Sequence, residues 1–325
     1  MGRLAVLLAE SDRDAVMNSL RAAVIDTSLA VFMAEEFARV AAESVRLTES
    51  QVRTAKARFD LGQAQKSDLL SAEVRLAEAK ENLVKADNAR SRALTALRNL
   101  LGLSADAPLA LEGAGEFSVP PVEEASVAVA LENRPELRKA ADAVRMAEED
   151  VAMQRAGYHP TVSLFGSYDW DTEITSDPDF EDSGTVGLTL DWALFEGGRT
   201  RANVTAARAR LEAAREGERK ARLAVESDVA MATLRLAEAR KRLEVSLTTT
   251  AQAEEALRLI AARYENGAAT ITEYLDAEVA LTRARVRNVA ARFDVERATA
   301  DLRRAVGICR AAPVTEEGFE EGEDR

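Results

Sequence analysis

The sequence has few of the residues from which compact enzymes build loops and catalytic sites. Its 325 residues include only 7 prolines, 16 glycines and 5% aromatics. The single cysteine, Cys309, excludes an internal disulfide and a cysteine-based zinc site, and the single histidine, His159, is expected to lead into a strand. No glycine-rich phosphate loop or nucleophile elbow is visible, so we expect no enzyme activity, no metal site and no cofactor. The net charge of −13 gives nucleic-acid binding no electrostatic support.

Long hydrophobic runs are also lacking. No segment approaches the 18 or more apolar residues of a transmembrane helix, so none is expected. The opening residues (MGRLAVLLA) faintly resemble a signal peptide. Charged residues at positions 10–14 follow at once without a small-residue cleavage site, so we reject that interpretation. Membrane β-strands remain the only way for this chain to span a bilayer.

The chain is rich in Ala, Arg, Glu and Leu, which is the composition of long helices and coiled coils. It also contains a gapless internal repeat at an offset of 205 residues. Residues 58–64 (RFDLGQA) align with 263–269 (RYENGAA), and 70–76 (LSAEVRL) align with 275–281 (LDAEVAL). About a third of the aligned positions are identical, and Gly62 and Gly267 stand at the same helix break. We therefore predict one structural unit that occurs twice.

Both copies carry an apolar heptad, which predicts supercoiled helices that approach closely along a small-residue seam. The first copy has Leu69, Leu76, Leu83 and Leu97, with Ala72, Ala79, Ala86, Ala93 and Leu100. The second has Tyr274, Leu281, Val295 and Leu302, with Ala277, Ala284, Ala291, Ala298 and Ala305. Before each glycine we predict another long helix, at about 4–60 and 199–265. The second would be on the order of 100 Å long at 1.5 Å per residue. A plain cytosolic coiled coil would explain these helices equally well.

Between the repeats the pattern changes. Residues 103–121 contain three prolines and two glycines, which indicates a linker. A helix is then expected to run to about Ala156. Asn133 is suited to its N-cap, Pro135 to its first turn and Glu136 to a capping box.

After His159 the apolar period becomes 2, which predicts strands at Thr161–Asp171 and Gly184–Leu194, joined by an acidic loop. Each run has about the 11 residues that a tilted membrane strand needs. Both tryptophans lie here, as in an interfacial aromatic belt. The residues expected to face lipid are Val162, Leu164, Tyr168, Trp170, Val186, Leu188, Leu190 and Trp192. A soluble hairpin with one face on a helix remains an alternative. In lipid, this hairpin would need partner strands because its two edges are unpaired.

Four segments, in this order, resemble the outer-membrane efflux protein family typified by TolC. They are residues 133–137 (NRPEL), 158–164 (YHPTVSL), 187–199 (GLTLDWALFEGGR) and 263–267 (RYENG) with 275–278 (LDAE). With the duplicated helices, they cover essentially the whole chain. Ala193 departs from the proline that is common in the family at that position.

The resemblance implies a mainly α protein, an α-barrel protomer whose β-hairpin joins a trimeric outer-membrane β-barrel. It implies a homotrimer in outer-membrane lipid, with a large periplasmic part. The partners would be a periplasmic adaptor protein and an inner-membrane transporter, and the trimer would be a passive exit duct for efflux or type I secretion. The alternatives are a periplasmic adaptor, whose lipoyl-like and β-barrel segments we do not find, and a structural coiled-coil protein.

The implied organisation has six parts. These are 1–102 (first helical repeat), 103–132 (equatorial linker), 133–157 (helix), 158–198 (outer-membrane hairpin), 199–308 (second helical pair) and 309–325 (an acidic tail expected to be disordered). The offset places Met1 opposite Ala206. Family members begin each repeat with a helix and a hairpin, so we expect roughly 90 residues and a signal to precede this frame in a complete protein.

The resemblance also implies specific functional residues. Gly197 and Gly198 would be the swivel where strand becomes helix. The channel entrance would lie at the turns and comprise Tyr264, Gly267, Glu273, Asp276, Gly62 and Asp68. Ala269 replaces an arginine that helps to hold the family's gate shut. Alternatively, Glu273 and Asp276 are ordinary first-turn acids that interact with the helix dipole.

Overall fold

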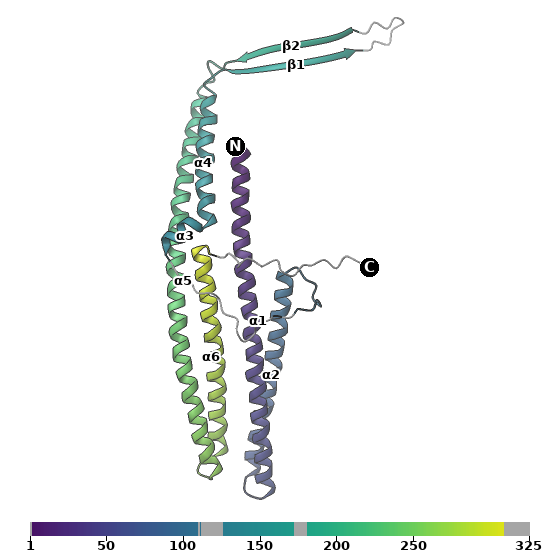
Figure 1. Cartoon of the computed structure of the whole chain (residues 1–325), viewed down its shortest axis with the longest axis vertical. Helices are drawn as coiled ribbons and strands as arrows, with labels where there is room; N and C mark the ends of the chain where they lie inside the picture. Colours follow the sequence, from purple (N-terminus) through teal and green to yellow (C-terminus); the bar gives the residue numbers. More distant parts are fainter. Residues whose placement is uncertain (1, 110, 112–125, 172–180, 309–325) are drawn as a thin grey trace, which may run out of the picture. The chain divides into compact units, whose positions relative to one another are not determined.

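In the computed structural model, residues 2–109, 111, 126–171 and 181–308 are described, and side chains are described from residue 6 onward except at 169–171 and 181–183. The expected disordered tail at 309–325, most of the linker and most of the acidic loop lie outside this part. The elements in order are α1 (Gly2–Asp60), α2 (Lys66–Leu100), α3 (Val127–Asn133), α4 (Pro135–Ala156), β1 (Thr161–Asp171), β2 (Glu181–Asp191), α5 (Arg199–Glu265) and α6 (Ile271–Val306) (Figure 1). The mainly helical fold class is confirmed.

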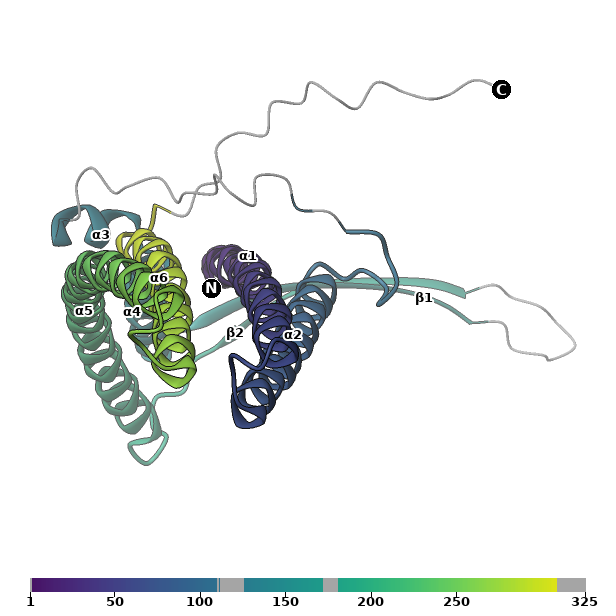
Figure 2. The same ribbon diagram turned by 90° about the horizontal axis from the view of Figure 1, so that it is seen from below.

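The chain divides into two units. One contains residues 1–13 and 135–223, and therefore α4, the hairpin and the first part of α5. The other contains residues 14–134 and 224–325, with most of α1, the rest of α5, and α2, α3 and α6. In this second unit, α1 lies beside α2 and α5 beside α6 (Figure 2).

The duplication predicted from the sequence is visible in how the helices end. Gly62, Gly102, Gly267 and Gly307 each follow a long helix with φ between 70° and 80°. At each, the glycine N–H donates to the carbonyl three residues before, and the next N–H donates to the carbonyl five residues before it. This is the Schellman C-cap, which requires a left-handed residue and therefore favours glycine. The two pairs, 62 with 267 and 102 with 307, are 205 residues apart.

The heptads are buried to different degrees in the two copies. In α6 the tyrosine, leucine and alanine positions are buried: Tyr274, Ala277, Leu281, Ala284, Ala291, Ala298, Leu302 and Ala305. In α2 only Ala72, Ala79 and Leu97 are buried. The reason is that α6 packs on α1, where Leu29, Phe32 and Val40 form a core cluster with Val289, Phe293 and Ala300. Among the described residues, no helix covers the other side of α2 in this way.

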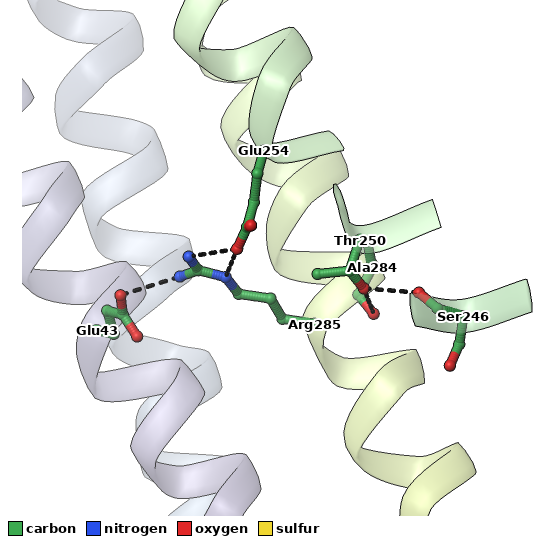
Figure 3. Close-up of polar contacts among 6 residues, drawn as sticks. All are labelled: Glu43, Ser246, Thr250, Glu254, Ala284 and Arg285. Carbon is green, nitrogen blue, oxygen red and sulfur yellow. Dashed lines mark hydrogen bonds and ion pairs between the residues drawn. The ribbon is translucent and has the colours of Figure 1, made fainter. Parts of the chain in front are cut away.

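Ion pairs tie the two repeats together through α6. Arg285 places Nη1 2.9 Å from Glu43 Oε1 of α1 and Nη2 3.0 Å from Glu254 Oε1 of α5 (Figure 3). Nearby, the Thr250 hydroxyl donates to the Ala284 carbonyl oxygen at 3.4 Å. Arg285 is about one-third exposed and thus bridges α1 and α5 from its place on α6.

Three local expectations need correction. Asn133 ends α3 and is not an N-cap; Arg134, in an extended conformation, separates α3 from α4, which begins at Pro135 as expected. The short helix α3 was not foreseen, although its own residues include no proline or glycine. The second strand is Glu181–Asp191, three residues earlier than predicted, because the antiparallel register pairs Thr161 with Asp191.

One further expectation was wrong. Within the described part, one helix is long and apolar enough to cross a membrane by length and composition alone, in the stretch from Val6 to Asp60 of α1. Leu29 and Phe32 of this helix belong to the core cluster described above. Part of this apolar surface therefore serves helix packing.

Candidate functional site: the helical tip and the strand hairpin

The two turns expected to form the channel entrance are built alike. Gly62 follows α1 and Gly267 follows α5, both with φ of +71°. A Cβ at either position would have open space around it, so only the backbone conformation demands glycine there. Each turn leads directly into the next helix of its pair.

The acids after these turns cap the helices that follow. The Glu273 carboxylate accepts from the Thr270 backbone N–H at 2.7 Å, and the Glu273 N–H donates to the Thr270 hydroxyl at 3.2 Å, which forms a capping box. In the first copy, Asp68 accepts from the Gln65 N–H at 3.3 Å. The backbone hydrogen bond from Thr270 lowers the pKa of Glu273. Glu273 therefore stabilises the start of α6, as expected of an ordinary first-turn acid. A further role at a channel entrance is compatible with this.

Asp276 has a different partner from Glu273. Its Oδ1 lies 3.3 Å from Arg75 Nη2 of α2, and its side chain is exposed. The two acids thus lie on the first turns of α6, where one caps the helix and the other forms a surface ion pair across to the first repeat. Convergence of copies of these acids on a pore axis stays a prediction.

Tyr264 lies in an aromatic and cationic cluster. The Arg58 guanidinium carbon lies 4.5 Å from the centre of its ring, and the Tyr274 ring centre lies 5.6 Å away. Tyr274 is buried, and its hydroxyl accepts from Gln51 Nε2 at 2.7 Å. Burial, with nearby Glu278, raises the pKa of Tyr274 to about 12. The cluster joins α1, α5 and α6 at the turns, and the sequence reading had placed only Tyr264 there.

A buried carboxylate just above this cluster was missed by the sequence reading. Glu278 is 4% exposed, and its Oε1 accepts from the Thr48 hydroxyl at 2.8 Å, while its Oε2 has no hydrogen-bond partner among the described residues. It lines a polar cavity of about 210 Å³ with Ser44, Arg75 and Asn82. Burial raises the pKa of Glu278, against the opposing effects of Thr48 and Arg75. The sequence contained a signal for this burial, because Glu278 directly follows Ala277, one of the small residues at which the helices were predicted to approach closely.

The hairpin places the residues expected to face lipid on one face. In an antiparallel pair, residues directly opposite each other lie on the same face of the sheet. On this face the pairs are Val162 with Leu190, Leu164 with Leu188, Gly166 with Val186 and Tyr168 with Gly184. The described side chains of that set are all exposed. The opposite face carries Thr161, Ser163, Ser167, Thr185 and Thr189. Within the described residues these two strands are the only sheet, so both outer edges are unpaired.

Two aromatic residues of the hairpin need separate mention. Phe165 breaks the alternation because its ring lies over Gly187, where an added Cβ would come within 2.5 Å of the ring. Trp192 follows the end of β2, where its Nε1 donates to the Tyr158 carbonyl at 3.4 Å. The Trp170 side chain lies outside the described part.

The expected swivel joins the hairpin to α5. Gly197 and Gly198 have φ of +60° and +86°, and α5 begins at the next residue. Close by, a Cβ at Gly157 would lie 3.3 Å from Thr200 Cγ2, so the end of α4 and the start of α5 pack tightly. The sequence reading did not single out Gly157.

Replacing Gly198 by alanine should lower the melting temperature, because a left-handed L-residue costs roughly 1–2 kcal/mol. The matched control is Gly217→Ala inside α5, where an added Cβ meets nothing within 4 Å. That change should raise stability by about 1 kcal/mol, because alanine is the better helix former. Thermal unfolding followed by circular dichroism measures both. Equal shifts in the two variants would show that the positive φ at Gly198 is not required.

Among the described residues there is no group of three or more His, Cys, Asp or Glu that could hold a metal ion. What the chain offers is a set of surfaces: an apolar strand face, paired helical turns and glycine joints.

The comparisons identify the class of protein. The family model for outer membrane efflux proteins matches residues 2–103 and 127–308. The chain belongs to the outer membrane efflux protein family, which consists of channel proteins and not of enzymes. It is an outer-membrane protein of a Gram-negative bacterium with a periplasmic helical extension.

Individual relatives are similar over part of their length. The outer membrane efflux protein BepC of Brucella suis is 31% identical over 178 residues, 55% of this chain and 39% of BepC. The alkaline protease secretion protein AprF of Pseudomonas aeruginosa is 31% identical over 193 residues, 54% of this chain and 39% of AprF. The alignments therefore span about two fifths of the length of these relatives.

A solved structure shows the same fold. The open state of the Neisseria gonorrhoeae MtrE outer membrane channel superposes with a TM-score of 0.80 at 25% identity, covering 94% of this chain and 70% of MtrE. The long helical pairs and the hairpin between α4 and α5 thus follow a known outer-membrane channel fold.

Proposed function

We propose that this chain is a subunit of a passive exit duct, which lets substrates delivered by an inner-membrane transporter cross the outer membrane. The observation that carries the proposal is a hairpin with a continuous exposed apolar face, on the same chain as four long helices in two pairs. The hairpin fits a bilayer, and the helices fit a tunnel that extends into the periplasm. The duct catalyses nothing.

The duct is a homotrimer. A two-stranded hairpin leaves backbone donors and acceptors unpaired along both edges, and in lipid each such group costs several kcal/mol. Strands from other copies of the same chain satisfy these edges by closing a barrel. The apolar face then contacts the lipid.

The duct works with a periplasmic adaptor protein and an inner-membrane transporter, which supplies the energy. The names of two relatives refer to efflux and to protease secretion. A wide, water-filled passage has no fitted pocket, so the transporter decides what is exported.

The entrance of the duct lies at the paired turns around Gly62 and Gly267. Glu273 and Asp276 share one helix face because they are three residues apart. In a trimer, three copies of each carboxylate draw cations into the pore. With Ala269 in place of the gate arginine, Arg58 supplies a cation at Tyr264 instead, 4.5 Å from the ring centre.

Single-channel recording in planar bilayers tests both the duct and its entrance. The complete trimer, including the residues expected to precede this frame, should form water-filled pores that prefer cations. The double variant Glu273→Gln with Asp276→Asn should show lower cation selectivity and weaker block by divalent ions, because the pore has lost its fixed negative charge. Glu265→Gln, one residue past the aromatic cluster and outside the capping box, is the control. A complete trimer that never conducts contradicts the duct, whereas conducting pores with unchanged selectivity leave Glu273 with its capping role only.

A further inference from the structure

The carboxylate of Glu278 is enclosed between three helices of the second unit. It lines the polar cavity of about 210 Å³ that α1, α2 and α6 form together. The residue is only 4% exposed, and among the described residues its Oε2 has no hydrogen-bond partner. A carboxylate that is withdrawn from bulk water and is incompletely hydrogen-bonded is costly to ionise. The charged form of Glu278 is therefore disfavoured as long as the three helices stay packed.

Glu278 belongs to the polar contact that holds α6 to α1 near the turns. Its Oε1 accepts from Thr48 at 2.8 Å, and the Tyr274 hydroxyl accepts from Gln51 Nε2 at 2.7 Å. Tyr274 and Glu278 are four residues apart and share one face of α6. Burial raises the pKa of Tyr274 to about 12, so this hydroxyl keeps its proton in acid and at neutral pH. Glu278 is the group in these two contacts that can change its charge in that range.

The charged groups around the cavity do not neutralise Glu278. Those on its wall are Arg75 and Glu78 of α2 and Arg283 of α6. The wall residues of α1 are uncharged, and among the described residues α5 contributes none. Arg75 lies 2.9 Å from Glu78 and 3.3 Å from Asp276, so two other carboxylates share its charge. Arg283 is exposed, where water and salt screen its charge.

The first repeat carries the same acid without the enclosure. Glu73 lies 205 residues before Glu278 and follows Ala72 as Glu278 follows Ala277, yet Glu73 is exposed. An exposed carboxylate stays hydrated whether or not its helix moves. Protonation of Glu73 therefore favours neither arrangement of the helices, whereas protonation of Glu278 does.

We propose that Glu278 is a proton-binding switch for the contact between α1 and α6 at the entrance of the duct. Its neutral form holds the two helices together, and its charged form loosens them. This inference rests on the proposed duct and assigns a control to its entrance. Loosening of the contact moves the turn at Gly267, which leads into α6, relative to the turn at Gly62, which follows α1.

Thermodynamic linkage gives the direction of the switch. When α6 separates from α1, water reaches the Glu278 carboxylate, and its pKa returns toward the ordinary value of 4.5. Burial raises this pKa in the packed arrangement, so the packed arrangement binds the proton more tightly than the loosened one. As pH rises from 4.5 through the raised pKa, the packed arrangement loses this advantage. The entrance is thus held shut more firmly in acid than at neutral pH.

The distance between spin labels on α1 and α6 tests the switch without relying on conduction. In a Cys309→Ser background, Lys56→Cys and Thr272→Cys place the labels at exposed positions near the turns. An excess of unlabelled chain leaves one labelled copy in each complete trimer. Pulsed electron spin resonance should show longer and broader distances at about pH 8 than at about pH 5, because the charged carboxylate loosens the contact.

Two variants show whether Glu278 causes this change. Glu278→Gln keeps the size of the side chain and an acceptor for Thr48 but is neutral at every pH, so it should give the short distance at both pH values. Glu73→Gln should keep the response of the wild type. A pH response that persists in Glu278→Gln, or a wild type without any response, contradicts the switch.

Single-channel recording of the complete trimer gives a second readout. The fraction of time spent open should be several-fold lower at about pH 5 than at about pH 8, and Glu278→Gln should abolish this difference. Both measurements use a Glu273→Gln and Asp276→Asn background, which removes the titration of the other two entrance acids. Pores that conduct with the same open fraction at both pH values contradict the switch and leave the duct standing. A trimer that never conducts contradicts the duct, while the label distances still decide the switch.

Discussion

Replacing Leu188 by arginine is expected to prevent assembly of the protein in the outer membrane. Leu188 lies near the middle of β2, opposite Leu164, on the face that carries the exposed apolar residues of the hairpin. A charged side chain on the lipid face of a membrane strand costs roughly 2–4 kcal/mol near the midplane of the bilayer. Every copy in an oligomer would carry this cost. Membrane fractionation and heat-resistant oligomer bands on gels measure the outcome.

The adjacent residue supplies a control for this prediction. Thr189→Arg introduces the same side chain one residue later, on the polar face of the hairpin. Substitutions on the water-facing side of a membrane barrel are tolerated and alter selectivity, so this variant should assemble normally. Normal assembly of Leu188→Arg, or equal failure of both variants, would mean that the apolar face does not contact lipid.

Replacing Thr48 by valine is expected to destabilise the helical part by about 2–3 kcal/mol near neutral pH, because a buried carboxylate loses its hydrogen-bond donor. Glu278 Oε1 accepts from Thr48, and its Oε2 already lacks a partner, so no other donor is in place. Chemical denaturation followed by far-ultraviolet circular dichroism measures the change.

Burial of Glu278 should also make the free energy of unfolding depend on pH. Burial raises the pKa of Glu278 above its ordinary value of 4.5. In the window between these two values the folded state holds a proton that the unfolded state has released, so stability falls as pH rises through that window. The free energy of unfolding of the wild type, relative to Glu278→Gln, should therefore fall as pH rises above 4.5. Removing the Thr48 hydrogen bond, which favours the charged form, should raise the pKa further and extend this fall to higher pH.

The duplication again provides the control. Glu73 is the counterpart of Glu278 in the first repeat and is exposed. Glu73→Gln should leave the stability unchanged. A flat pH profile for Glu278→Gln relative to the wild type would show that Glu278 ionises normally despite its burial.

Much of the fold could be predicted from local patterns. The glycine breaks at 62 and 267, the long helices around them and the alternation in residues 161–171 are local signals, and each appears in the structure. The end of β2 was misplaced by three residues because alternation continues to Leu194, whereas the strand ends where its partner β1 begins. Which residue pairs with which is set across the hairpin, so a single strand cannot reveal it.

The sequence by itself determined that this protein has two copies of a helical pair and one strand hairpin, because period and glycine spacing are properties of the local chain. Only the tertiary structure decided which residues of each copy are buried. The motifs LSAE and LDAE place Glu73 and Glu278 at the same position of their helices, yet one is exposed and the other is buried against Thr48. The physical reason is that burial depends on what packs opposite a residue. In the part of the chain that the structure describes, α1 covers α6, while the equivalent face of α2 is exposed.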